Sequence, residues 1–174
     1  MSLLYSLILL GCSVVIPMQL FAEEKTDIIQ KSTPTGIWCL LHSYSIKDAN
    51  KRMHQLNNTP CWTNPNVQGI ILRAQWDKIE PIEGQYDFSY YDRGFELAKK
   101  YNKRIEIRVS AGKHSPEWVY AAGAEKFTFH HKNGKPPEYM PIPWDPVHQE
   151  KYGNLVRRLG ERYDSSPYLS DVVM

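Results

Sequence analysis

With 174 residues, the chain is long enough to bury one hydrophobic core of its own. The formal net charge is only +2 and the basic residues are dispersed, so the sequence lacks the clustered positive charge that is typical of a nucleic-acid-binding domain. Five tryptophans and eleven tyrosines suit sugar rings and a large core equally well. We therefore expect a single domain without a nucleic-acid partner.

The N-terminal segment predicts export. Residues 3–22 are mostly apolar and carry no charged side chain, and an acidic start follows them. This pattern is typical of a signal peptide over residues 1–22 with cleavage after Ala22, giving a secreted or periplasmic protein. Leu9-Leu10-Gly11-Cys12 also resembles a lipoprotein cleavage box, so a lipoprotein anchored at Cys12 is the alternative. Pro17 and the short length disfavour a stable membrane span.

The domain itself is expected over residues 36–174, after a polar linker at 23–35. Its first strand is predicted at 36–43, where the sequence GIWCLLHS is mostly apolar. Ser45-x-x-Asp48 predicts the start of a helix. The apolar residues of that helix have roughly helical spacing: Ile46, Ala49, Met53 and Leu56.

Two cysteines remain once the leader is removed. Cys39 lies in the first predicted strand, and Cys61 lies just before the second. Neighbouring strands in an oxidising compartment allow a disulfide between them, but we favour two free, partly buried thiols. The pair has no further His or Cys at ligand spacing, so no metal site is predicted.

The second strand, predicted near 67–76, organises the domain. Gly69-Ile70-Ile71-Leu72 is a continuous apolar run, as expected of a strand covered on both faces in a parallel sheet. Arg73, Gln75 and Trp76 then appear where the strand ends, and Glu83-Gly84 indicates a turn. A strand that ends in polar and aromatic side chains and continues through a loop into a helix is the repeating unit of an α/β barrel.

A second helix is predicted near 89–101, opened by a capping box at Ser89-x-x-Asp92. Four apolar or aromatic residues are expected to face the sheet: Tyr91, Phe95, Ala98 and Tyr101.

The third strand, predicted at 104–111, alternates strictly between apolar and polar residues. The two sets are Ile105, Ile107 and Val109, and Glu106, Arg108 and Ser110. In a barrel the apolar set lies under the helices, and the polar set lies inside the mouth together with Arg73 and Gln75. Two arginines and one glutamate leave one positive charge unmatched on this face. Because burying an unpaired charge is expensive, we expect Arg73 within hydrogen-bonding reach of Glu106 or of a carboxylate from elsewhere.

The remainder of the chain completes half a barrel. Residues 112–143 form a long connection, and Asp145-Pro146 predicts the start of a third helix. The buried stripe of that helix is predicted at Tyr152, Leu155, Val156, Leu159 and Tyr163. A fourth strand begins at residues 171–174. The predicted fold class is α/β, with three βα units followed by a fourth strand. This order is the N-terminal half of a (β/α)8 TIM barrel, which takes ~250 residues when complete.

Several motifs carry a resemblance to a known family. Trp76-x-x-Ile79-Glu80-Pro81-x-x-Gly84-x-Tyr86-Asp87-Phe88, followed by Asp92, resembles the second βα unit of clan A glycoside hydrolases. Further matches follow in order: Ser115-Pro116-Glu117-Trp118-Val119, Pro143-Trp144-Asp145-Pro146, and Leu159-Gly160-x-Arg162-Tyr163. From about Gly36 to Met174 the chain is similar to the family 42 β-galactosidase-like enzymes. The resemblance implies a carbohydrate substrate and retaining hydrolysis of a β-linked glycosidic bond, without metal or organic cofactor.

The resemblance also locates the catalytic carboxylates, at the ends of barrel strands four and seven. The acid/base Glu usually follows an Asn just past strand four, where this sequence stops, so we assign no catalytic residue within it. Glu80 and Glu117 are better explained by a loop and by a helix start. The alternatives to a glycosidase fragment are a non-catalytic carbohydrate-binding protein and a truncated α/β domain without activity.

Four residues are candidates for binding substrate. Arg73 resembles the clan's arginine that supports the nucleophile carboxylate, and the alternative is an internal salt bridge with Glu106. His114 follows the third strand, where cellulase-like members place a histidine near the sugar, although a backbone-bonded loop histidine is the reading we favour. Trp76 and Trp118 are candidates for stacking on a pyranose, with packing at the rim as the alternative.

Two other tryptophans are interpreted as structural. Trp144 lies beside two prolines and before a helix cap, which favours a packing role. Trp38 shares the predicted inward face of the first strand with His42, and we expect it to fill the core.

Overall fold

The computed structural model describes residues 31, 33–41, 46 and 48–174 of the chain. The predicted signal peptide, the alternative anchor at Cys12 and most of the linker lie outside the described residues, as do His42 and Ser45. In the part of the chain that the structure describes, every helix is too short or too polar to cross a membrane.

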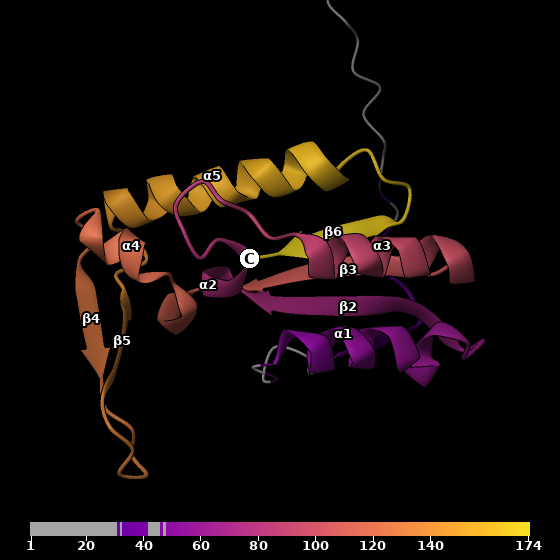
Figure 1. Ribbon diagram of the computed structural model, residues 1–174, viewed down its shortest axis with the longest axis horizontal. Helices are drawn as coiled ribbons and strands as arrows, with labels where there is room; N and C mark the ends of the chain where they lie inside the picture. The colour runs from indigo at the N-terminus through magenta and orange to yellow at the C-terminus, as the bar shows by residue number, and fades with distance from the viewer. Residues whose placement is uncertain (1–30, 32, 42–45, 47) are drawn as a thin grey trace, which may run out of the picture.

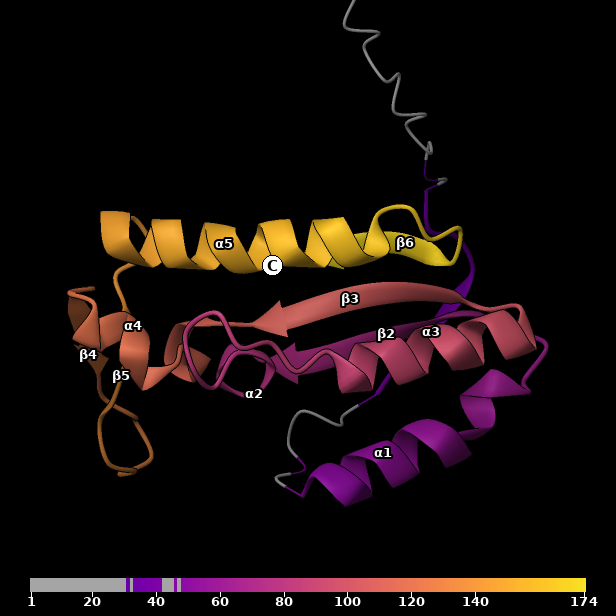
Figure 2. The same ribbon diagram turned by 45° about the horizontal axis from the view of Figure 1, so that its top comes forward.

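Four parallel strands form the sheet, in the order β1-β2-β3-β6 (Figure 1). They are β1 (Ile37–Leu40), β2 (Val67–Gln75), β3 (Arg104–Ser110) and β6 (Leu169–Val173). The long helices between them are α1 (Ala49–Asn58), α3 (Ser89–Tyr101) and α5 (Pro146–Tyr163). In Figure 2, α5 lies above the strands, α3 in front of β2 and β3, and α1 below them. This order confirms the predicted half barrel of three βα units plus a fourth strand. The shorter elements are η2 (Pro60–Trp62), α2 (Trp76–Ile79), η3 (Gly112–His114), α4 (Glu117–Ala121), β4 (Lys126–Phe129) and β5 (Glu138–Pro141).

The main core lies between the sheet and its helices, because every second residue of β2 and β3 is apolar. These residues are each at most 8% exposed: Ile70, Leu72, Ala74, Ile105, Ile107 and Val109. They share one core cluster with buried residues of α3 and α5, including Leu97, Leu155 and Leu159. Gly94 allows α3 to approach β2 closely, since a Cβ there would lie 2.2 Å from Leu72 Cδ1. The alternation predicted for the third strand is therefore confirmed.

Helix α5 begins where the sequence predicts. Asp145 is its N-cap, and the Asp145 carboxylate accepts a hydrogen bond of 2.8 Å from the backbone N–H of His148. Leu155, Leu159 and Tyr163 are buried as expected, whereas Val156 is 40% exposed. Because Val156 lies one residue beyond Leu155, it is rotated about 100° around the helix and leaves the buried stripe.

The capping box predicted at Ser89 and Asp92 is wrong. Helix α3 has Phe88 at its N-cap, without a side-chain cap. The Asp92 carboxylate instead reaches across to α5, where it accepts two hydrogen bonds from Arg162, of 2.8 and 2.7 Å, and one from the Tyr163 hydroxyl. In α1, by contrast, Asp48 caps the helix and accepts from the N–H groups of residues 50 and 51.

The long connection predicted at 112–143 has structure of its own. After η3 and α4 it forms an antiparallel hairpin of β4 and β5, which projects from the end of the sheet to which β2 and β3 point (Figure 1). Near its tip, Gly134 has a positive φ of 75°, a conformation that favours glycine. The hairpin therefore stands at the carboxyl end of the strands.

The two cysteines form a disulfide, so the expectation of free thiols is wrong. Cys39 and Cys61 are joined with their Cα atoms 6.3 Å apart, within the usual range for this bond. The bond forms because β1 pairs with β2 and Cys61 lies in η2, immediately before β2. It ties the edge strand of the sheet to the segment that leads into the central strand.

Candidate functional site

The carboxyl ends of β2, β3 and β6 surround a hollow, here called the mouth. Its lining includes Arg73, Arg108, Ser110, His114 and Val173. Arg73 is the register partner of Arg108, and Gln75 is the partner of Ser110, so these four side chains share one face of the sheet. It is the face opposite the helices, because the alternating residues Leu72 and Ala74 are buried in the core.

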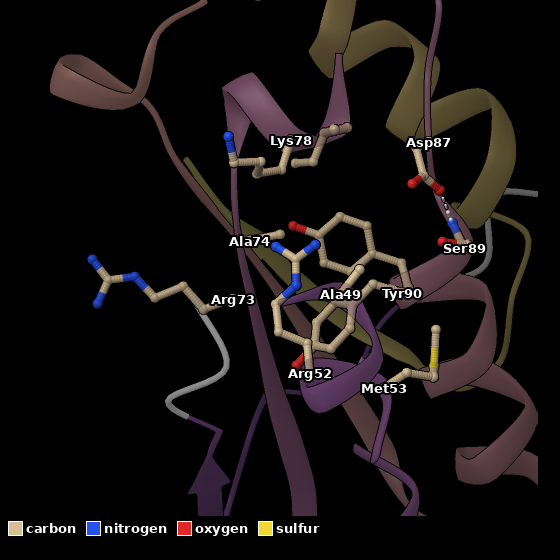
Figure 3. Close-up of a pocket in the computed structure, with 11 residues that line it drawn as sticks. Ala49, Arg52, Met53, Arg73, Ala74, Lys78, Asp87, Ser89 and Tyr90 are labelled. Atoms are coloured by element: carbon tan, nitrogen blue, oxygen red, sulfur yellow. Dashed lines mark hydrogen bonds between the residues drawn. The ribbon is translucent and has the colours of Figure 1, made fainter. Parts of the chain in front are cut away.

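The outer side of β2 confirms this orientation. A small hollow there lies among α1, α2 and the start of α3, with Ala49, Met53 and Tyr90 in its lining. Arg73 also lines this hollow, but its guanidinium group extends away from the other side chains of the lining (Figure 3). The guanidinium group of Arg73 is therefore directed to the inner side of the half barrel.

Arg73 is held in the mouth by Ser110. The Arg73 Nε donates a hydrogen bond of 2.8 Å to Ser110 Oγ. Glu106, one of the two partners expected for Arg73, accepts a hydrogen bond from Arg108 Nε within β3. The alternating register that points Glu106 and Arg108 to the same face brings these two residues together.

The charge count predicted for this face omitted two residues, Arg104 and Asp171. β6 begins at Leu169, earlier than expected, and Asp171 is the register partner of Glu106. Parallel register partners point to the same side of a sheet, so Asp171 lies inside the half barrel next to Glu106. Arg104 alternates with Glu106 and Arg108 along β3, so three arginines and two carboxylates belong to this face.

His114 lies at the rim of the mouth. It ends η3, and its Nε2 lies 3.5 Å from Gln75 Nε2. Burial lowers the pKa of His114, and the nearby Asp77 carboxylate opposes that shift. The imidazole is therefore neutral at pH 7, when it can donate one hydrogen bond and accept another. The structure thus brings Arg73 and His114 together at one site.

Trp76 is not at the mouth. It is fully buried, with 0% of its surface exposed, and packs against Trp118, His148 and Tyr152. The chain turns from β2 into α2 at this residue, and that turn carries the ring behind the sheet end. A sugar has no access to either face of Trp76, so the packing alternative describes it.

Trp118 is placed apart from the mouth as well. Its indole N–H donates to the backbone oxygen of Glu80 at 3.0 Å, and its ring meets Trp76 edge to face at 5.7 Å. It lines a different hollow, between the loop that follows α2 and the outer surface of α5, together with Tyr86 and Lys151. The four predicted binding residues therefore divide into a pair at the mouth and a pair behind it.

Glu80 has a structural role in the loop after α2. It is 1% exposed, and its carboxylate accepts hydrogen bonds from Trp76 Nε1 at 2.9 Å and from the N–H of Gly84 at 2.8 Å. Burial and the neighbouring Glu80 carboxylate raise the pKa of Tyr86. The spacing from Trp76 to Glu80 to Gly84 is thus explained by one buried acceptor.

Comparison with known proteins identifies the family. The family model described as β-galactosidase, glycoside hydrolase family 42, matches residues 66–173, which run from the start of β2 to the end of β6. The chain belongs to this family. The curated β-galactosidase BbgII of Bifidobacterium bifidum is 33% identical over 100 residues, covering 54% of this chain and 14% of that protein.

Solved β-galactosidases share the fold of this family 42 chain. The enzyme of Marinomonas ef1 matches with a TM-score of 0.55 and 11% identity, over 79% of this chain and 21% of that one. The enzyme of Halorubrum lacusprofundi matches with a TM-score of 0.52 and 16% identity, over 79% and 20%. The chain therefore spans about a fifth, or less, of the length of these relatives.

The mouth of this family 42 chain offers groups that can bind a sugar. Among the described residues that line it there are cationic, hydroxyl and imidazole groups, and no Asp or Glu. The described residues likewise contain no group of three or more His, Cys, Asp or Glu placed to hold a metal ion. What the lining residues can do is orient hydroxyl groups and hold a carboxylate brought in by another segment.

Sequence reasoning missed two features of this end of the molecule. Trp144 is 76% exposed, so its predicted packing role is wrong. Its neighbour Asp145 turns inward to cap α5, and this leaves Trp144 on the outside. The hairpin was also missed, although Lys126–Phe129 alternates and Asn133-Gly134 is a turn signal.

Proposed function

We propose that this chain forms the sugar-binding N-terminal half of a secreted, retaining β-galactosidase barrel that acts on β-linked galactosides. One observation carries the proposal: Arg73 stands at the carboxyl ends of four parallel strands, held by Ser110, in a chain of the β-galactosidase family. Active sites of (β/α)8 barrels lie at this end of the strands.

In the proposed reaction, Arg73 orients a carboxylate. Its Nε donates to Ser110, and this bond fixes the position of the guanidinium group at the ends of the strands. A fork of parallel N–H groups matches a carboxylate and keeps it ionised, as a nucleophile requires. His114, neutral at pH 7, is suited to bind a sugar hydroxyl beside it.

The two catalytic carboxylates are proposed to come from segments outside this sequence. A retaining glycosidase needs them about 5–5.5 Å apart across the scissile bond. Glu80 cannot serve, because both of its oxygens are bound within the loop and it is buried. Glu117 lies on α4 and accepts a hydrogen bond from Tyr139, away from the described residues that line the mouth.

Export is part of the proposal. The disulfide between Cys39 and Cys61 is of a kind that persists in oxidising compartments, which supports the leader interpretation of residues 1–22. The mature protein should begin at Glu23, and intact mass of the exported protein measures this. A mature chain that begins at a lipidated Cys12 would establish the anchored alternative instead.

Binding of D-galactose tests the proposed function directly. Saturation-transfer NMR on the chain should show galactose binding, and Arg73→Lys should weaken it because the guanidinium fork is lost while the charge remains. Arg157→Lys, an exposed arginine on α5, is the matched control and should leave binding unchanged. Absence of galactose binding would favour a structural α/β domain.

Turnover of an aryl β-galactoside separates the enzyme from a binding protein. Residues 23–174 alone should show none, whereas a protein that also carries the catalytic carboxylates should show it. Turnover by residues 23–174 that disappears in Glu80→Gln or Glu117→Gln would place the catalytic pair inside this chain. Galactose binding without turnover in any longer reading frame would identify a non-catalytic carbohydrate-binding protein.

A further inference from the structure

The β4–β5 hairpin carries a local concentration of positive charge that the overall net charge of +2 conceals. Residues 126–137 read KFTFHHKNGKPP, with three lysines, two histidines and no Asp or Glu. Lys126, Lys132 and Lys135 are all exposed. The hairpin projects from the body of the molecule, so these charges stand on an outlying ribbon (Figure 1).

The acidic residues that flank this segment lie at the base of the hairpin. Glu125 precedes β4, and Glu138 begins β5. Glu138 is already engaged, because its carboxylate pairs with Lys113 at 3.0 Å and lies 3.5 Å from His131 Nε2. The ion pairs of the described residues therefore leave the two lysines of the tip, at 132 and 135, available to an outside partner.

The ribbon is held in place without any partner. The Tyr139 ring on β5 lies 5.3 Å from the Tyr120 ring, edge to face. Lys126 Nζ lies over both rings, 4.3 Å from the centroid of Tyr139 and 4.6 Å from that of Tyr120. Pro136 and Pro137 restrict the backbone immediately before β5. A surface that is fixed in advance loses little conformational entropy when it binds a partner.

The spacing of the lysines indicates an extended partner. Lys126 begins β4, and Lys132 lies six residues further along, near the tip. Six residues of extended chain span at most about 20 Å, so the positive charge is distributed along the ribbon. A small anion would meet one end of this array, whereas a polymer with many negatively charged units matches its whole length.

Two observations favour a polysaccharide over a lipid surface. Phe127, which is 54% exposed, lies near the base of the hairpin, and the tip at 132–135 has no apolar side chain that could enter a bilayer. Lys113, which is bound to the hairpin through Glu138, also lines the mouth. A sugar polymer that enters the mouth therefore has the ribbon beside it.

We propose that the β4–β5 hairpin binds an acidic polysaccharide, a β-linked galactan that carries sulfate or carboxylate groups and places one of its units in the mouth. The inference rests on the proposed function and adds to it the class of substrate, a charged polymer in preference to a neutral one. The ribbon recognises the charged groups of the polymer, away from the bond that is cleaved.

Two polymers with the same backbone test the proposal: β-1,4-galactan, and the same galactan after chemical sulfation. In titration calorimetry the chain should bind the sulfated polymer more tightly. Lys132→Gln combined with Lys135→Gln should weaken that binding roughly fivefold, because each exposed ion pair contributes a few-fold in affinity. The binding of neutral galactan should stay unchanged. Replacement of both lysines by arginine keeps the charges and should keep the affinity.

Lys99→Gln combined with Lys100→Gln is the matched control. These two exposed lysines lie on α3, away from the hairpin, and their replacement removes the same charge (Figure 1). The affinities for both polymers should stay the same. Raising the salt concentration from about 50 to about 500 mM should weaken binding of the sulfated polymer, because salt screens exposed charges. Binding of D-galactose should not respond.

The possible failures are distinguishable. Equal affinities for the two galactans, or equal losses in the hairpin and α3 variants, would overturn this inference, while galactose binding would still support the proposed function. Phosphatidylglycerol vesicles or single-stranded DNA bound as tightly as the sulfated galactan would overturn the polysaccharide as the partner. Absence of D-galactose binding, with lysine-dependent binding of the sulfated polymer retained, would overturn the proposed function and the placement of the polymer in the mouth.

Discussion

Glu80 illustrates how a carboxylate in a family motif can be structural. The sequence analysis predicted that Glu80 is not catalytic because it lies in a loop, and the structure shows what its carboxylate does instead. Its two oxygens accept from Trp76 and from the backbone of Gly84, which fixes the turn after α2. A buried acceptor of this kind is costly to replace, since the donors around it would lose their partner.

Replacement of Glu80 should therefore destabilise the fold. Glu80→Gln places an amide N–H₂ toward one of the two donors, and we expect a loss of about 1–3 kcal/mol in the free energy of unfolding. Glu83→Gln, three residues away, removes only an exposed ion pair with Lys151 and should cost less than about 1 kcal/mol. Urea denaturation of both variants measures the difference, and similar losses would contradict the buried role of Glu80.

The residue scale is also where sequence reasoning was least complete. Strand alternation was enough to place Arg73 and Ser110 on the same inner face. It could not place Trp76, because one residue of uncertainty at the end of β2 decides whether a side chain faces the mouth or the core. Asp171 was missed for the same reason, since its orientation depends on a bulge in the register of β3 and β6.

At the scale of elements, the order of strands and long helices follows from hydrophobic periodicity. Helix N-caps were harder to predict. The sequence Ser-x-x-Asp is the same whether the Asp carboxylate accepts a hydrogen bond from the start of its own helix or from a side chain of another helix. At α3 the carboxylate of Asp92 binds Arg162 and Tyr163 of α5, an alternative that only the tertiary fold provides. At α5 the Asp-Pro pair has fewer alternatives, and the prediction there is confirmed.

Two cap variants should separate these cases. Asp145→Ala removes a buried cap and should destabilise the protein by about 1–2 kcal/mol. Ser89→Ala should cost less than about 0.5 kcal/mol, because Ser89 makes no cap bond to α3. Thermal unfolding of the two variants provides the comparison. A loss of stability in Ser89→Ala as large as that in Asp145→Ala would support the capping box predicted at Ser89.

The first turn of α5 should also make stability depend on pH. Burial lowers the pKa of His148, opposed by the carbonyl of Pro143 and by Asp145. The unfolded chain therefore binds this proton more readily, so stability is complete above the unfolded pKa of about 6.5 and falls as the pH drops below it. His114 contributes in the same direction, because burial lowers its pKa too.

Melting temperatures measured from pH 7 to pH 5 should show this decline. His148→Phe keeps the aromatic packing on Trp76 and Tyr152 and should make the decline shallower. His54→Phe, an exposed position on α1, should leave the slope as it is. A slope unchanged by His148→Phe would show that other groups govern the acid response.

At the scale of the whole molecule, the half barrel has two open edges, β1 and β6. Apolar side chains are exposed along them, including Ile37 at 61% and Val173 at 42%. Unpaired strand edges with exposed apolar groups favour association with other chains. The sequence predicted these edges correctly, since they follow from the number of strands alone.

Residues 23–174 expressed alone should therefore associate or remain loosely packed. Size-exclusion chromatography should show species larger than a monomer, and a dye that binds apolar surface should fluoresce. A monomeric chain with a sharp thermal transition and no dye binding would contradict this expectation.

The bond between Cys39 and Cys61 has a consequence for proteolysis. The cysteines are 22 positions apart, and the chain between them includes α1, where Lys51 is exposed to a protease such as trypsin. A cut after Lys51 leaves the two fragments joined through sulfur. β1 can then stay paired with β2 in a nicked molecule, and only a reductant together with the cut would release it.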